Sequence, residues 1–186
     1  MNVLTTDIEG VLILEPKMFG DARGFFMETW SRERYVQAGL NERFLQDNVS
    51  SSSKGVLRGL HFQYPQPQGK LVQVIQGEVL DVAVDIRVGS PTFGQHVTCL
   101  LSHENHRQFF VPKGFAHGFC VLSEIALFLY KCTDYYNPQA ESGVLWNDPA
   151  LGIDWPVDVP TLSEKDAKLA CLKDIPKDRL PVYGEA

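Results

Sequence analysis

The chain has 186 residues, of which 44% are hydrophobic and 22% are charged, and its formal net charge is −6. This length is enough for one domain with a sizeable core, and the composition is that of an ordinary globular protein. The negative charge excludes a surface built as a whole to attract nucleic acid or an anionic membrane. An anionic ligand would therefore need positive charge that is concentrated in one place.

Strand-like segments dominate the chain. They are rich in β-branched and aromatic residues, and short turns of Gly, Pro, Asn and Ser separate them, which is the pattern of a sandwich or jelly roll. In chain order, we expect strands within residues 10–16, 23–30, 56–63, 70–89, 95–102, 107–112 and 117–136.

Two helices are expected beside these strands. The first covers residues 31–38 and is closed by Gly39, a residue favoured just after a helix end. The second begins within residues 162–172, where Ser163 and Asp166 have the spacing of a capping box. The expected fold is therefore all-β, with a few short peripheral helices.

No repeat, low-complexity segment or linker divides the sequence, so we predict a single domain over residues 1–186. Neither a secretory signal pattern nor an apolar run of about 18 residues that could span a bilayer is found. The four cysteines form no CxxC pair and no zinc spacing, and three of them lie in apolar runs typical of reduced, buried thiols: Cys99, Cys120, Cys132 and Cys171. We expect a cytoplasmic protein.

Two strands carry polar residues where apolar ones are usual. In residues 56–63, strict alternation puts Arg58 on one face and His61 on the other, although each polar group needs a partner if it is buried. In residues 78–87, one face is apolar (Leu80, Val82, Val84, Ile86) and the other carries Asp81, Asp85 and Arg87 with Ala83. This second face is either solvated or lines a polar cavity.

Two short motifs resemble those of the cupin superfamily, which are small β-barrels of jelly-roll type. Residues 111–117 match the pattern PxGxxH through Pro112, Gly114 and His117. The other motif, residues 61–77, is altered, because the positions of two histidines and a glutamate in a metal-binding cupin hold His61, Gln63 and Lys70.

The altered motif argues against a metal. The ammonium of Lys70 has no lone pair and repels a divalent cation, and His61 and His117 alone are too few ligands. Lys70 can instead stabilise an enolate, His61 is suited to proton abstraction near neutral pH, and Tyr130 can donate a proton. Together they suit proton removal next to a carbonyl, although a structural role is possible for each residue alone.

The sequence also resembles one enzyme family, the dTDP-4-dehydrorhamnose 3,5-epimerases, from about residue 10 to residue 168. The matching segments include FGDARGFFMETW, QDNVSSSSKGVLRGLHFQ, GKLVQVIQGEVLDVAVDIRVGSPTFGQ, RQFFVPKGFAHGF, FLYKCTDYYNP, WNDPALGIDWP and LSEKDA. The resemblance implies an epimerase without metal or organic cofactor that inverts C3 and C5 of a dTDP-linked 4-keto-6-deoxyglucose. It assigns His61 as base, Tyr130 as acid, Lys70 to the keto oxygen and Asp166 as the carboxylate that orients His61.

The spacing from Ser163 gives Asp166 a competing role as part of a helix cap, and one carboxylate can serve both. For the diphosphate, Arg23 and Arg58 are candidates, and a bulge at Gly59 would aim Arg58 and His61 to the same side. The resemblance adds to the substrate site Glu28, Gln46, Asn48, His117, Glu141 and Lys165, with Tyr135 as a candidate for stacking on the base or for core packing.

The resemblance further implies a homodimer formed by pairing sheets, in which Arg23 and Glu28 reach the neighbouring active site. Three alternatives stay open: an epimerase that inverts only C3 or only C5 of a related nucleotide sugar, a metal-dependent cupin oxygenase, and a non-catalytic sugar-binding jelly roll. Solvent deuterium exchange separates them, since only an epimerase labels the carbons that flank the ketone.

Overall fold

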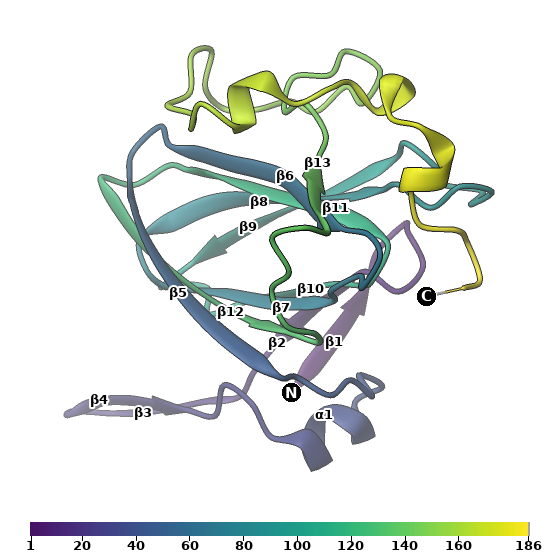
Figure 1. Cartoon of the computed structure of the whole chain (residues 1–186). Coiled ribbons are helices and arrows are strands. Elements are labelled where there is room, and N and C mark those ends of the chain that lie inside the picture. The colour runs from purple at the N-terminus through teal and green to yellow at the C-terminus, as the bar shows by residue number, and fades with distance from the viewer. Residues whose placement is uncertain (186) are drawn as a thin grey trace.

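Two antiparallel sheets face each other in a computed structural model that describes residues 1–185, and they enclose a barrel of jelly-roll type (Figure 1). The first sheet has the strand order β1 (Asn2–Thr5), β2 (Leu12–Glu15), β10 (Gln108–Val111), β7 (Lys70–Gln76), β12 (Ile125–Cys132), β5 (Gln46–Ser53). The second has the order β13 (Glu141–Gly143), β6 (Leu57–Gln63), β11 (Phe115–Val121), β8 (Glu78–Asp85), β9 (His96–Ser102). The all-β prediction is confirmed.

A separate hairpin extends away from the barrel. It consists of β3 (Met18–Asp21) and β4 (Gly24–Met27), and Figure 1 shows it projecting beside the N-terminal end of the molecule. Every predicted segment contains a strand, but β1, β3, β5 and β13 were not predicted from the sequence.

The core fills the space between the two sheets. Phe109 and Phe128 of the first sheet pack with Phe119 of the second, and the rings of Phe119 and Phe128 stack with centroids 4.1 Å apart. The outer face of the second sheet is covered by the C-terminal segment, where Leu172 and Leu180 join a second apolar cluster. Both faces of β8 are therefore buried, and Asp81 and Asp85 are fully buried rather than solvated.

A bulge in β6 resolves the alternation problem of that strand. Opposite β11, His61 pairs with His117 and Arg58 pairs with Phe119, so β6 uses one residue more than its partner. The extra residue brings Arg58 and His61 to the same side, which confirms the bulge expected at Gly59. Only glycine fits there, because φ is +126° and a Cβ would lie 2.5 Å from the Cα of Gly118.

The first predicted helix is confirmed as α1 (Arg32–Gln37), which is followed by Gly39 at φ +96°. Its Tyr35 is buried, and the phenol donates to Oε1 of Gln108 at 2.7 Å, so the helix is anchored to the first sheet. No helix of the described residues is long and apolar enough to cross a membrane.

The prediction of a second helix is wrong. Residues 162–172 form only the short 3-10 turn η1 (Asp166–Lys168), and two further turns follow, η2 (Leu172–Asp174) and η3 (Lys177–Arg179). The reason is a tertiary contact: Ala170 forms a parallel bridge with Val144, and its carbonyl accepts a hydrogen bond from the N–H of Leu145 at 2.8 Å. This pairing requires extended backbone at the point where a helix would continue.

Candidate active site

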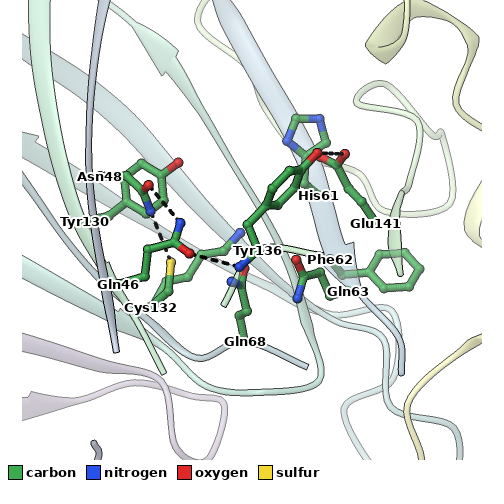
Figure 2. A pocket seen from close by; sticks show the side chains of 11 residues that line it. Gln46, Asn48, His61, Phe62, Gln63, Gln68, Tyr130, Cys132, Tyr136 and Glu141 are labelled. Carbon is green, nitrogen blue, oxygen red and sulfur yellow. Dashed lines mark hydrogen bonds between the residues drawn. The ribbon is translucent and has the colours of Figure 1, made fainter. Parts of the chain in front are cut away.

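A cavity of about 280 Å³ opens at one end of the barrel, between the two sheets (Figure 2). Its walls come from strands of both sheets and from the loop before β13. The lining residues are Gln46, Asn48, His61, Phe62, Gln63, Gln68, Lys70, Tyr130, Cys132, Tyr136 and Glu141. Five residues that the sequence analysis placed in the site therefore share this cavity with His61.

His61 lies on the wall formed by the second sheet and is paired with a buried carboxylate. Its Nε2 is 2.6 Å from Oδ1 of Asp166, whose side chain is only 5% exposed. With Nε2 donating to the carboxylate, the ring presents the lone pair of Nδ1. This is the arrangement of an imidazole whose tautomer is fixed and whose protonated form would be stabilised.

The charge of Asp166 is supported from several directions. Burial raises the pKa of its carboxyl, but hydrogen bonds from His61, from the Ser163 side chain and from the Gly59 backbone lower it below the ordinary value. The Asp166 N–H donates to Oγ of Ser163 at 3.0 Å. Ser163 thus caps the short turn while the Asp166 carboxylate contacts His61, so the cap and the contact with His61 coexist.

Tyr130 and Lys70 lie on the opposite side of the cavity from His61. Tyr130 comes from β12 of the first sheet, and Figure 2 shows its ring across the cavity from the imidazole. Burial raises the pKa of the Tyr130 phenol, so the phenol holds its proton at neutral pH. Lys70 begins β7, and it forms no ion pair within residues 1–185.

The family model for dTDP-4-dehydrorhamnose 3,5-epimerase matches residues 5–174 of the sequence. The chain belongs to the dTDP-4-dehydrorhamnose 3,5-epimerase family. It is 58% identical over 170 residues to the Salmonella typhimurium enzyme of this name, an alignment that covers 90% of this chain and 93% of the relative.

Solved structures of the family and its neighbours have the same fold. The dTDP-6-deoxy-D-glucose-3,5-epimerase of Legionella pneumophila, solved in complex with dTDP-4-keto-L-rhamnose, is 56% identical with a TM-score of 0.95, and the match covers 98% of each chain. A 3′-monoepimerase of Streptomyces bikiniensis, solved with dTDP-quinovose, is 35% identical with a TM-score of 0.88, over 96% of this chain and 92% of that one. The jelly-roll fold is thus shared by epimerases of different outcome.

Hydrogen bonds connect the polar side chains around the cavity of this family member. Nε2 of Gln46 donates to Oδ1 of Asn48 at 2.9 Å, and Nδ2 of Asn48 donates to Sγ of Cys132 at 3.6 Å. Oε1 of Gln46 accepts the backbone N–H of Tyr136 at 2.9 Å, and the Tyr136 hydroxyl donates to Oε2 of Glu141 at 2.8 Å. These bonds hold the side chains of Gln46 and Asn48 on β5 between the Cys132 thiol and the backbone of Tyr136.

A second groove of about 300 Å³ adjoins the cavity and shares His61 and Glu141 with it. Arg58 and Lys165 line this groove, so two cations lie next to the imidazole. Nε of Arg58 donates to Oγ of Ser52 on β5 at 3.0 Å, and Lys165 forms an ion pair with Glu141. The carboxylates of Glu141 and Asp166 also line the groove and contact Lys165 and His61, so the Arg58 guanidinium is the cation of the groove that no carboxylate pairs within residues 1–185.

Four residues that the sequence analysis placed in the site do not line either space. Arg23 and Glu28 belong to the projecting hairpin and the segment after it, where they pair with Asp21 and Arg34. The Tyr135 side chain is 62% exposed, and the Tyr135 carbonyl accepts from Gln63. His117 lies behind the cavity, with its Nε2 2.9 Å from Oδ1 of Asp81.

The structure adds cavity residues that sequence reasoning missed. Cys132 follows Tyr130 by two residues on β12, and period-two alternation places it on the same face, so a signal for it existed. Tyr136 lies in a loop with no such periodicity, and the sequence analysis names its neighbour Tyr135. Gln63 and Gln68 also line the cavity. Among residues 1–185, no cluster of three or more His, Cys, Asp or Glu side chains has the arrangement of a metal site.

Proposed function

We propose that this protein inverts C3 and C5 of dTDP-4-dehydro-6-deoxy-D-glucose, without metal or organic cofactor, to give dTDP-4-dehydro-L-rhamnose. The observation that carries the proposal is the His61–Asp166 pair on one wall of a cavity, with Tyr130 on the other wall. Inversion removes a proton from one face of a carbon and returns one to the opposite face. It therefore needs two proton-transfer groups on opposite sides of the substrate.

In this mechanism His61 takes the proton from C3 or C5, both of which flank the C4 ketone. The electron pair of the C–H bond moves into an enolate, whose oxygen is stabilised by the Lys70 ammonium. Tyr130 then donates its proton to the same carbon from the other face. The imidazolium is held beside the Asp166 carboxylate, and solvent restores both groups, so the substrate and product differ only in configuration.

The nucleotide diphosphate is assigned to the groove lined by Arg58 and Lys165. A guanidinium binds phosphate oxygens in a bidentate manner. His61 lines both this groove and the cavity, which supports a pose with the sugar beside the His61 imidazole. Glu141 lines both the cavity and this groove, whereas Gln46 and Asn48 line the cavity on its Tyr130 side, and all three offer hydrogen bonds to sugar hydroxyls.

A homodimer accounts for the distant positions of Arg23 and Glu28. The β3–β4 hairpin projects from the barrel and exposes three aromatic side chains, Phe19 at 55%, Phe25 at 60% and Phe26 at 70%. In addition, β5 is the edge strand of the first sheet and is free to pair along its outer side. A second copy that covers the hairpin would receive Arg23 and Glu28 at its own site.

Free thiols at all four cysteines agree with a cytoplasmic location.

The decisive experiment incubates the protein with dTDP-4-dehydro-6-deoxy-D-glucose in deuterium oxide. We expect one deuteron each at C3 and C5, together with the L-rhamno configuration after reduction. Label and inversion at only one carbon would assign a monoepimerase, the activity named for the Streptomyces bikiniensis neighbour. Binding without any label would contradict an epimerase.

Subunit mixing tests the crossed site. Arg23→Ala and His61→Ala variants are each expected to be strongly impaired alone. A mixed dimer of the two has one site with both lesions and one with neither if the hairpin crosses to the partner. Mixing should then restore up to half of the wild-type activity per mixed dimer, whereas no recovery would place Arg23 in its own subunit's site.

A further inference from the structure

Asp81 is a fully buried carboxylate whose function is not explained by the mechanism above. It lies on β8 on the inner face of the second sheet, and only one of its oxygens is engaged, by Nε2 of His117 at 2.9 Å. The other oxygen, Oδ2, is buried and has no hydrogen-bond partner within residues 1–185. A half-satisfied buried carboxylate is costly, so its second oxygen calls for a positive group nearby.

Lys70 is the candidate for this positive group, and it comes from the other sheet. It is the first residue of β7, its side chain lines the cavity, and none of the described residues forms an ion pair with its ammonium. Burial raises the pKa of Asp81 and lowers that of Lys70, and the opposite charge of each partner acts against these shifts. The barrel interior thus contains an incompletely paired anion and an incompletely paired cation that stabilise each other.

We propose that Asp81 is a positioning residue for the epimerase reaction: its buried carboxylate, shared between His117 and Lys70, keeps the Lys70 ammonium charged and directed toward the C4 oxygen of the substrate. The inference rests on the proposed function for the identity of that oxygen, but the coupling between the two side chains does not depend on it.

The need for such a partner follows from burial. Burial lowers the pKa of Lys70, and a neutral amine could not stabilise an enolate. The groups around Lys70 come from five strands and one loop. They are Cys132 and Tyr130 of β12, Glu141 of β13, His61 of β6, His117 of β11, Asp81 of β8, and Tyr136 of the loop before β13.

Asp81 is the acidic group best suited to hold this charge. Glu141 already forms an ion pair with Lys165 and accepts from Tyr136. The thiol of Cys132 stays protonated, because burial raises its pKa. Asp81 alone combines complete burial with a free oxygen.

The experiment titrates Lys70 directly by NMR, using protein labelled with 13C at the lysine ε-carbon. The Lys70 signal is assigned with a Lys70→Arg variant. In Asp81→Asn we expect the titration of Lys70, and with it the alkaline limb of kcat/KM, to move to lower pH by about one unit or more. A Lys70 titration that coincides with that of the wild type would overturn the proposal. The NMR shift is read without turnover, so it is independent of whether the substrate is the one proposed.

Asp85→Asn is the matched control. Asp85 lies on the same face of β8 and is equally buried, but Arg87, Ser90 and Thr92 engage both of its oxygens. Its replacement should lower the melting temperature and leave the Lys70 titration unchanged. An equal shift in Asp85→Asn would show that general loosening of the barrel, rather than the Asp81 charge, moves Lys70.

A reciprocal measurement decides the question if Asp81→Asn does not fold. Coupling free energies are symmetric, so Lys70→Met should raise the pH at which the carboxyl carbon of Asp81 titrates in protein labelled with 13C at aspartate. An unchanged Asp81 signal, or an Asp81 that is already protonated in the wild type at neutral pH, contradicts the proposal.

Discussion

The molecule contains two histidine–aspartate pairs of nearly equal length that lie in different surroundings. His61 and Asp166 meet at 2.6 Å at the mouth of the barrel, whereas His117 and Asp81 meet at 2.9 Å in its interior. The two imidazoles even sit opposite each other on neighbouring strands, as register partners of β6 and β11. Side-chain identity and distance alone would therefore give the two pairs the same role.

Their surroundings separate them. Burial raises the pKa of both carboxyls, but Ser163, Gly59 and His61 offset it for Asp166, and the pKa ends below its ordinary value. Asp81 lacks such donors at its second oxygen, and its pKa remains raised. The first imidazole is 29% exposed and faces the cavity, and the second is 7% exposed. We expect access and the number of donors to the carboxylate to determine which pair exchanges protons with a ligand.

Replacing the two histidines gives the largest expected contrast. His61→Ala should lower both inversion and deuterium wash-in by about 10³–10⁴-fold, because a general base contributes up to that factor. His117→Gln should cost at least tenfold less, since the buried imidazole supports the barrel and does not take the proton. Steady-state turnover and exchange rates check this, with nucleotide binding as the control for folding. Equal losses in the two variants would remove the distinction between the pairs.

Tyr130→Phe tests whether the His61–Asp166 pair works with a separate acid on the other side of the cavity. Without the phenol, His61 can still remove a proton and return a deuteron to the face it came from, because Lys70 still holds the enolate. We expect inversion to fall by about 10²–10³-fold while exchange at C3 or C5 falls much less. Mass spectrometry counts the deuterons, and NMR of the reduced sugars reports configuration. Strictly parallel losses would argue against separate acid and base.

Asp166→Asn should cost more than tenfold in turnover with little change in melting temperature. The amide keeps the size of the side chain but removes the charge that stabilises the imidazolium. Ser163→Ala is the companion variant, since it removes the cap and leaves the carboxylate; its expected loss is about 0.5–2 kcal/mol of stability. If Asp166 served only as part of the cap, the pattern would be reversed.

The smallest effect is a difference in how stability depends on pH. Because the pKa of Asp166 is lowered in the folded state, its ionised form stabilises the fold above the ordinary value of 3.8, and this contribution is lost as the pH falls through the lowered pKa. The pKa of Asp81 is raised, so its ionised form destabilises the fold at neutral pH, and acid relieves the penalty. The stability cost of Asp166→Asn should therefore shrink in acid, whereas that of Asp81→Asn should grow. Urea unfolding at pH 7 and below pH 4 measures both.

Sequence reasoning predicted the barrel because its residues lie in periodic strands. The two cupin-like motifs and the family resemblance single out His61, Lys70 and Tyr130, and all three side chains line one cavity. Sequence reasoning did not predict β5, because its Gln-, Asn- and Ser-rich sequence resembles a loop. One face of this strand lines a polar cavity and therefore does not need apolar residues. Sequence reasoning also failed at residues 162–172, where a local capping signal is overridden by the bridge between Ala170 and Val144.

Arg23 and Glu28 pair with Asp21 and Arg34 and line neither the cavity nor the groove, in contrast to the site predicted for them. Nothing in the spacing of the hairpin residues tells whether their side chains turn inward or extend to a neighbour. For Asp81, the alternation of β8 predicts the face on which the side chain lies. That one of its oxygens lacks a partner is visible only in the three-dimensional packing.

The contact between Gly59 and Gly118 has a consequence for how this barrel can be altered. A Cβ at Gly59 would lie 2.5 Å from the Gly118 Cα, and a Cβ at Gly118 would lie 2.6 Å from the Arg58 carbonyl oxygen. Neither position can be relieved by changing the other, because each clash is with main-chain atoms. A deep mutational scan should find both positions intolerant of every substitution. Directed evolution toward other nucleotide sugars will thus have to vary β5 and the Tyr136 loop, while Gly59 and Gly118 stay fixed.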